Sequence, residues 1–138
     1  MKLINAGSNL APFQHLIMQI QQAKPIPFSS MTPASIPDSP GLYVITVEKD
    51  EVLRAGRTDL QTLRDRVYRN HLMGNQQGNL RQQLVRANYC TDLESAKDWI
   101  RQHCTVRVVE ANWLSENGLD QRWAEHFILA IFQPTFSN

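Results

Sequence analysis

Prolines divide this chain into two unequal parts. Five of its seven prolines fall between Lys24 and Pro40, in a stretch that also contains several serines. Because proline lacks an amide hydrogen and disfavours helix at the residue before it, we predict an extended connector here, without helix. The chain therefore divides into an N-terminal helix with its connector, residues 1–38, and a domain over residues 39–138. A chain of 138 residues can bury a core without disulfides or a structural metal.

Hydrophobic periodicity predicts three strands and an N-terminal helix. The helix is capped by Ser8, and an apolar stripe at helical spacing is expected to dock on the domain, formed by Leu10, Phe13, Ile17 and Ile20. Residues 41–47 and 52–55 are rich in β-branched and aromatic side chains around a charged turn, which predicts a β-hairpin. Residues 105–110 alternate and predict a third strand.

Helices are expected between and after these strands. The apolar spacing predicts one helix over 59–72, a short one around Leu80 and Leu84, one that begins at the capping box 91–94 and ends near His103, and one over 119–132. Residues 127–132 are apolar on every side, so we expect that half-helix to be buried. The predicted fold class is α/β: a small three-stranded antiparallel sheet flanked by helices, with an N-terminal helical extension.

Positive charge is concentrated in the middle of the chain, although the net charge of the whole is only +1. Residues 54–86 have a net charge of +5, and all their cations are arginines: Arg54, Arg57, Arg64, Arg66, Arg69, Arg81 and Arg86. The planar guanidinium suits bidentate contacts with phosphate oxygens. This favours a polyanionic partner, and the alternative is a solvated helical surface.

The cysteines and the hydropathy indicate a cytoplasmic protein. Cys90 and Cys104 do not form a CxxC pair or a zinc-ligand spacing, so we predict free thiols. No apolar run reaches the roughly 18 residues of a membrane span, and the first residues do not have the pattern of a signal peptide. We therefore expect neither secretion nor a membrane-spanning segment.

Glu125 is an informative exception in an apolar context. It stands two residues before the apolar run 127–132, where an unpaired carboxylate costs free energy. It either pairs with an arginine such as Arg122, or lies at the exposed start of the helix, or holds a magnesium ion together with water and phosphate oxygens. Tyr43, in the first predicted strand, is by itself more typical of packing than of catalysis.

Several short motifs, taken in order, resemble the GIY-YIG nuclease superfamily. Gly41-Leu42-Tyr43 is followed, eleven residues after the tyrosine, by Arg54-Ala55-Gly56, and then by the arginine-containing stretch 63–71. Glu125 then opens the apolar helix, and Asn138 ends the chain. His71-Leu72-Met73-Gly74, Asn79-Leu80-Arg81 and Trp99 also fit stand-alone members. The resemblance covers about residues 39–138.

The resemblance implies a metal-dependent endonuclease that hydrolyses phosphodiester bonds of DNA with one Mg²⁺ or Mn²⁺ ion. Glu125 would hold the metal, and Arg66 would contact the scissile phosphate. Tyr43 would activate or orient the attacking water, His71 would assist proton transfer, and Asn138 would tie the last loop to the site. Arg57, Arg64, Arg69 and Arg81 are expected to contact nucleic acid.

Two departures from the family pattern affect individual residues. Arg54 replaces the tyrosine of the second tripeptide; because arginine keeps its proton, it is better suited to partner a phosphate or a tyrosinate than to act as a base. Five residues separate Arg66 from His71, where the family more often has four. On an α-helix, residues five apart do not lie on the same face. Either His71 is therefore not catalytic, or the helix ends irregularly. Arg64 is the alternative to Arg66.

Three functional hypotheses remain. The first is the endonuclease, and the second is a catalytically impaired nucleic-acid-binding module on the same scaffold. The third is an interaction protein that acts through its N-terminal helix. The sequence contains no zinc finger or helix-turn-helix motif, so any sequence specificity is expected from a homodimer or from a separate partner.

Overall fold

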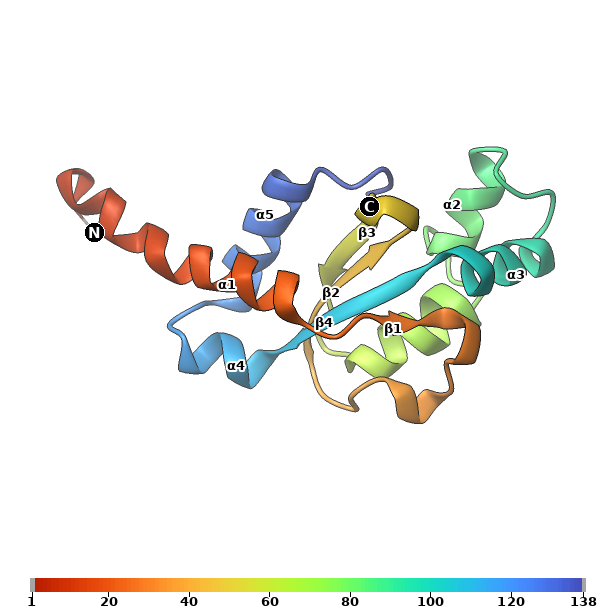
Figure 1. Ribbon diagram of the computed structural model, residues 1–138, viewed down its shortest axis with the longest axis horizontal. Coiled ribbons are helices and arrows are strands. Elements are labelled where there is room, and N and C mark those ends of the chain that lie inside the picture. The colour runs from red at the N-terminus through yellow and green to blue at the C-terminus, as the bar shows by residue number, and fades with distance from the viewer. Residues whose placement is uncertain (1, 138) are drawn as a thin grey trace.

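The computed structural model describes residues 2–137 and shows an α/β fold built around one antiparallel sheet (Figure 1). The strands are β1 (Ile26–Pro27), β2 (Gly41–Thr46), β3 (Val52–Arg57) and β4 (Thr105–Glu110). The α-helices are α1 (Leu10–Gln22), α2 (Leu80–Arg86), α3 (Leu93–His103), α4 (Ala111–Glu116) and α5 (Gln121–Phe132). A π-helix, η5 (Arg64–Leu72), precedes α2, and four 3₁₀ segments are η1 (Leu3–Asn9), η2 (Phe28–Ser30), η3 (Pro33–Ser35) and η4 (Glu48–Asp50).

The sheet has four strands in the order β1-β4-β2-β3, one more than the sequence predicts. The additional strand lies in the proline-rich connector, where Ile26 pairs with Val106 of β4. The connector also contains the 3₁₀ turns η2 and η3, so the expectation of a purely extended segment is wrong. Pro33 is compatible with the first position of a helical turn, because that position needs no amide hydrogen.

The connector contributes to the core. Its side chains Phe28, Met31 and Ile36 are buried among residues of the sheet and of the helices that follow. The backbone amide of Phe28 also donates to the carbonyl of Cys104, which anchors the turn η2 beside β4. The prolines therefore set the path of this segment without separating it from the rest of the molecule.

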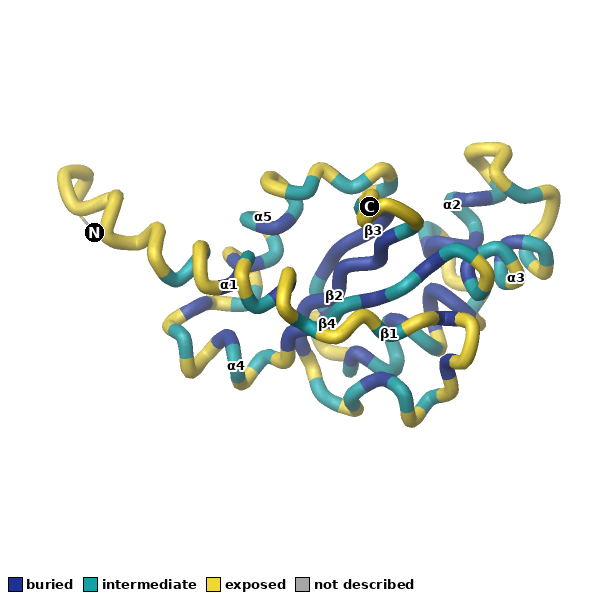
Figure 2. The backbone as a smooth tube through the Cα atoms, in the orientation of Figure 1, coloured by how far each residue is buried: buried dark blue, intermediate teal, exposed yellow. Residues whose placement is uncertain are grey.

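Helices cover both faces of the sheet. Helices α1, α4 and α5 cover the face that carries Leu42 and Val44. The connector, η5, α2 and α3 cover the face that carries Tyr43 and Ile45. Every residue of β2 is buried, and Figure 2 shows this central strand as the darkest part of the backbone.

The N-terminal helix docks through a slightly different stripe from the one predicted. Leu16 and Ile20 are buried, and Phe13 contacts Phe127 of α5 with 4.7 Å between ring centroids. Leu10 is 51% exposed, because the preceding segment projects away from the sheet (Figures 1 and 2). Asn9 rather than Ser8 occupies the cap position.

Two further helix predictions need correction. Helix α5 is not buried on all sides: Ile128 is buried, but Ile131 is 53% exposed, because one side of the helix faces away from the sheet. The capping box of α3 is formed by Asp92 and Ser95, one residue later than predicted. Among the described helices, none combines the length and the apolar character that crossing a membrane requires. Both cysteines are free thiols, as predicted.

Candidate functional site

The centre of the candidate site is a hydrogen bond between two buried side chains. The Oη of Tyr43 lies 3.0 Å from the Nε2 of His71. Tyr43 pairs across the sheet with Gly56 of β3, and a Cβ at position 56 would stand 2.7 Å from the tyrosine hydroxyl. Because glycine has no Cβ, position 56 leaves space for the Tyr43 hydroxyl group that contacts His71.

The other ring nitrogen of His71 determines which way this hydrogen bond runs. The backbone amide of Leu80, at the start of α2, donates to Nδ1 over 3.1 Å. Nδ1 is therefore unprotonated, and a neutral imidazole carries its proton on Nε2 and donates it to the Tyr43 oxygen. Burial, and then the charges of Arg54 and Arg66, hold the pKa of His71 well below its usual value. His71 is thus a neutral hydrogen-bond donor to Tyr43.

The π-helix η5 explains how His71 reaches this position. The predicted helix over 59–72 begins only at Arg64, and it is a π-helix, whose backbone hydrogen bonds join residues five apart rather than four. At its end the amide of Met73 donates to the carbonyl of Tyr68, five residues earlier. This wider winding brings Arg66 and His71 closer to a common face than an α-helix would, and the irregularity extends along the whole helix. A catalytic role for His71 stays a prediction.

Arg54 is a buried cation on the same face of the sheet as Tyr43. Its Nη1 donates to the carbonyl of Gly78 over 2.8 Å and to the Oε1 of Gln83. Burial lowers the pKa of Arg54, and its interactions with Tyr43 partly offset that effect. Held in this way, Arg54 places a fixed positive charge beside the tyrosine oxygen.

Arg66 supplies a second positive charge near the cluster. Its charge contributes to lowering the pKa of both Arg54 and His71. Within residues 2–137 the Nε of Arg66 is buried without a hydrogen-bond partner, and the side chain forms no ion pair. An arginine with unused donors suits an anionic ligand.

Glu125 lies at the free edge of the sheet, where it binds Arg57. Its Oε2 accepts the backbone amide of Arg57 over 2.9 Å, and its Oε1 lies 3.3 Å from the Arg57 Nε. The partner is therefore Arg57 and not Arg122, which the sequence offered as an example. The negative charge of Glu125 also offsets a small part of the lowering of the Arg54 pKa that burial causes.

The Glu125 carboxylate is the kind of ligand that a hydrated divalent cation uses. No group of three or more His, Cys, Asp or Glu side chains in the described part of the chain is arranged to hold a metal. Mg²⁺ does not need such a group, because it is commonly bound by one or two carboxylates with water and phosphate oxygens. The Glu125 carboxylate retains lone pairs beyond its contacts with Arg57, so one such ligand is present.

The remaining predicted arginines differ in their surroundings. Arg64 donates to the carbonyl of Ile36 and pairs with Asp38, and the exposed Arg69 pairs with Asp65. Arg81 is 5% exposed and donates to the carbonyls of Gly74 and Leu93. The structure thus places Arg64 and Arg69 where solvent reaches them, and Arg81 in the interior.

The C-terminal residues return to the candidate site. Thr135 and Phe136 donate backbone hydrogen bonds to Val52 and Leu53, along the free edge of β3 (Figure 1). Gln83, which accepts a hydrogen bond from Arg54, donates to the carbonyl of Ser137 over 2.9 Å. The predicted site residue Asn138 lies outside the described residues.

Two partners in this cluster were not found by sequence analysis. The Gln83 side chain links Arg54 to the chain end, and the Leu80 amide sets the tautomer of His71. The sequence contains one clue to the second: if Asn79 caps α2, Leu80 is the first helical residue, and the amide of that residue has no partner within the helix. Nothing in the local sequence indicates that Gln83 contacts Arg54.

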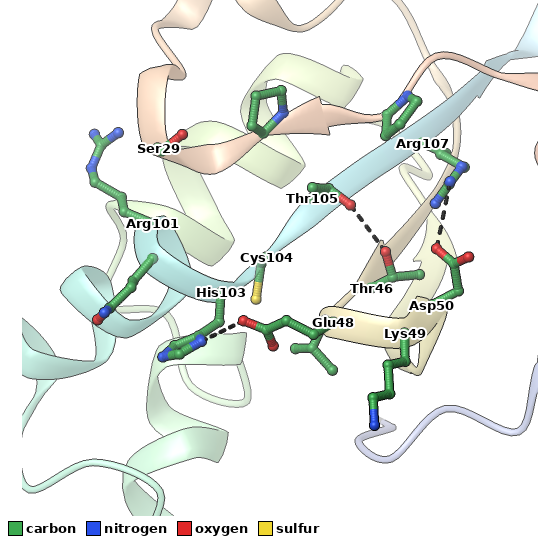
Figure 3. Close-up of a pocket in the computed structure, with 14 residues that line it drawn as sticks. Ser29, Thr46, Glu48, Lys49, Asp50, Arg101, His103, Cys104, Thr105 and Arg107 are labelled. Atoms are coloured by element: carbon green, nitrogen blue, oxygen red, sulfur yellow. Dashed lines mark hydrogen bonds and ion pairs between the residues drawn. The ribbon is translucent and has the colours of Figure 1, made fainter.

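A separate pocket of about 410 Å³ lies where the hairpin turn meets the start of β4 (Figure 3). None of its lining residues is a predicted site residue. Glu48 contacts His103 with 2.6 Å between Oε1 and Nδ1, and Asp50 pairs with Arg107. Because Glu48 and Asp50 already contact His103 and Arg107, their carboxylates are less available to a ligand of this pocket.

Comparison of this chain with protein-family models, curated proteins and solved structures finds no match.

Proposed function

We propose that this protein is a metal-dependent endonuclease that hydrolyses the phosphodiester bonds of DNA. The observation that supports this most strongly is the buried hydrogen bond from His71 to Tyr43, with Arg54 beside it. Burying such polar groups costs free energy, and the core on the opposite face of the sheet is formed by apolar side chains. Perturbed titratable groups that converge on one atom are typical of a catalytic site.

The chain's own residues account for the handling of the proton and of the phosphate charge. His71 donates a hydrogen bond to the Tyr43 oxygen, and the Arg54 guanidinium interacts with the same side chain. Such an oxygen is able to orient the attacking water and to accept its proton. Arg66, with unused donors, is suited to the negative charge that develops on the nonbridging phosphate oxygens.

Glu125 is the residue that would hold the metal in this proposal. A bound Mg²⁺ or Mn²⁺ ion supplies charge neutralisation on the phosphate and on the leaving oxygen. The remaining coordination positions would belong to water and substrate, because Glu125 is the one carboxylate assigned to the site.

The proposal is tested by incubating the full chain with labelled single-stranded and duplex DNA in Mg²⁺, in Mn²⁺ or in chelator. Metal-dependent cleavage is expected, and Glu125→Gln and Arg66→Gln should each reduce it at least about 100-fold. Arg86→Gln is the matched control, because Arg86 is an exposed arginine outside the cluster. Undiminished cleavage by Glu125→Gln would exclude the metal role of this residue.

Arg54 supports a second candidate, a nucleic-acid-binding module without turnover. It stands where GIY-YIG nucleases more often have a tyrosine, and its guanidinium donates hydrogen bonds to Gly78 and Gln83. Binding without cleavage under every metal condition would select this function. With four arginines in contact (Arg57, Arg64, Arg66 and Arg69), log affinity for duplex DNA should fall with log salt at a slope of about −3.6.

A further inference from the structure

We propose that Arg57 is the resident counter-ion of Glu125, and that a divalent cation binds this carboxylate tightly only when a phosphate group draws the Arg57 side chain away. The inference rests on the proposed function, since it concerns the regulation of the same site. It predicts that metal and nucleic acid strengthen each other's binding.

The geometry places one guanidinium between two carboxylates. The Nε of Arg57 lies 3.3 Å from Glu125 Oε1 and 3.0 Å from Asp59 Oδ1. Asp59 has a φ of 53°, a left-handed conformation that aspartate tolerates better than most residues. Asp59 lies two residues after the end of β3, and it forms its ion pair with Arg57 from there. In the free protein, the single positive charge of Arg57 thus offsets part of the negative charge of the two carboxylates that would attract a metal.

The two contacts between Arg57 and Glu125 have different consequences. The backbone amide of Arg57 holds Oε2 and belongs to β3, so it stays in place when the side chain moves. The guanidinium holds Oε1 and is carried by a long side chain that is 30% exposed. Rotation of the Arg57 side chain therefore frees one carboxylate oxygen while the other remains positioned.

Electrostatics makes the guanidinium and a metal ion competitors. The Glu125 side chain is only 16% exposed, so solvent screens charges here less than at the open surface. A divalent cation at Oε1 would lie within a few ångströms of the Arg57 charge and would be repelled by it. Either the side chain leaves or the affinity for metal falls.

A phosphate group offers Arg57 an alternative partner. Guanidinium binds phosphate with the same bidentate geometry that it uses for carboxylate, so the exchange loses little hydrogen bonding. Arg64, Arg66 and Arg69 on η5 add positive charge that attracts a polyanion to this part of the molecule. Because coupling between two ligands is reciprocal, metal bound at Glu125 would in turn strengthen nucleic-acid binding.

The first experiment measures the affinity of the full chain for Mn²⁺, without nucleic acid, by titration calorimetry. Arg57→Gln should bind Mn²⁺ on the order of tenfold more tightly than the wild type, because it removes a repelling charge. Arg57→Lys keeps the charge and should remain close to the wild type. Arg86→Gln removes one exposed arginine elsewhere and serves as the control for net charge. The double variant Arg57→Gln, Glu125→Gln should lose the increase in Mn²⁺ affinity that Arg57→Gln alone produces.

The second experiment repeats the Mn²⁺ titration with duplex DNA whose linkages are all phosphorothioates, which resist hydrolysis. The wild type should gain affinity for Mn²⁺ on the order of tenfold, and Arg57→Gln should gain clearly less. Equal Mn²⁺ affinity of wild type and Arg57→Gln in the absence of DNA would overturn the inference, even if the wild type cleaves DNA. A tighter Arg57→Gln variant that depends on Glu125 would support it, even if no cleavage is found.

Discussion

The two faces of the sheet are built from the same strands but bury different chemistry. The face covered by α1, α4 and α5 presents apolar side chains, among them Leu42, Val44 and Ala55. The opposite face presents Tyr43 and Arg54 from the same two strands, and these are buried as completely. Apolar burial needs only shape and volume, whereas each buried polar group also needs a partner. On the second face, packing alone does not explain the presence of Tyr43 and Arg54 in the core.

The largest expected difference between the faces concerns Arg54. Arg54→Ala should lower the free energy of unfolding by about 3–5 kcal/mol, because it leaves buried partners of the guanidinium without a hydrogen bond. Val44→Ala, on the apolar face, should cost about 1–3 kcal/mol. Urea denaturation of the two variants measures both values. Equal losses would mean that the polar face is stabilised by packing alone.

Removal of the Tyr43 hydroxyl tests the hydrogen bond itself. Tyr43→Phe should lower the free energy of unfolding by about 1–3 kcal/mol, because the buried His71 Nε2–H loses its acceptor. Tyr89→Phe is the matched control, since Tyr89 is exposed and its ring contacts do not use the hydroxyl. Denaturation curves of the two variants that coincide would contradict the role given to this bond.

The polar face should also make stability depend on pH. Unfolded His71 takes up a proton as the pH falls through about 6.5, whereas folded His71 stays neutral because its pKa lies well below that value. The free energy of unfolding should therefore be highest above pH 6.5 and fall toward pH 5, by at most about 1.4 kcal/mol per pH unit. Thermal or urea unfolding at several pH values measures this slope.

His71→Gln should flatten this dependence, and His15→Gln, a change at an exposed histidine, should leave it as in the wild type. The carboxyl groups whose pKa values are lowered, Glu48, Asp65 and Asp92, affect stability at more acidic pH. A slope between pH 5 and 7 that survives His71→Gln would assign the effect to another group.

The smallest effect is expected on the outer side of the apolar layer. Ile131→Ala should change the free energy of unfolding by less than about 0.5 kcal/mol, because the side chain is already exposed. Ile128→Ala, one turn earlier and buried, should cost about 2–5 kcal/mol. Chemical denaturation distinguishes these values. A large loss at Ile131 would indicate that another surface covers this side of α5.

Local sequence patterns were sufficient to predict the three longer strands of the sheet. The alternation of Thr105–Glu110 predicts β4 with its observed bounds, and the hairpin of β2 and β3 follows from β-branched residues around a charged turn. The two-residue strand β1 was missed, because a strand so short has no periodicity and includes Pro27. The exposure of Ile131 was missed because composition shows that a helix is apolar but not which neighbours cover it.

The candidate site also has a part that the sequence predicts and a part that only the tertiary structure shows. Residue types and order determined which side chains are available: Tyr43 in a strand, Arg66 and His71 five residues apart, and Glu125 ahead of an apolar run. Their partners depend on chain segments that are distant in sequence, and local periodicity carries no information about such contacts. The Leu80 amide on Nδ1 of His71 and the Arg57 side chain on Glu125 therefore became visible only when the sheet, η5, α2 and α5 were packed together.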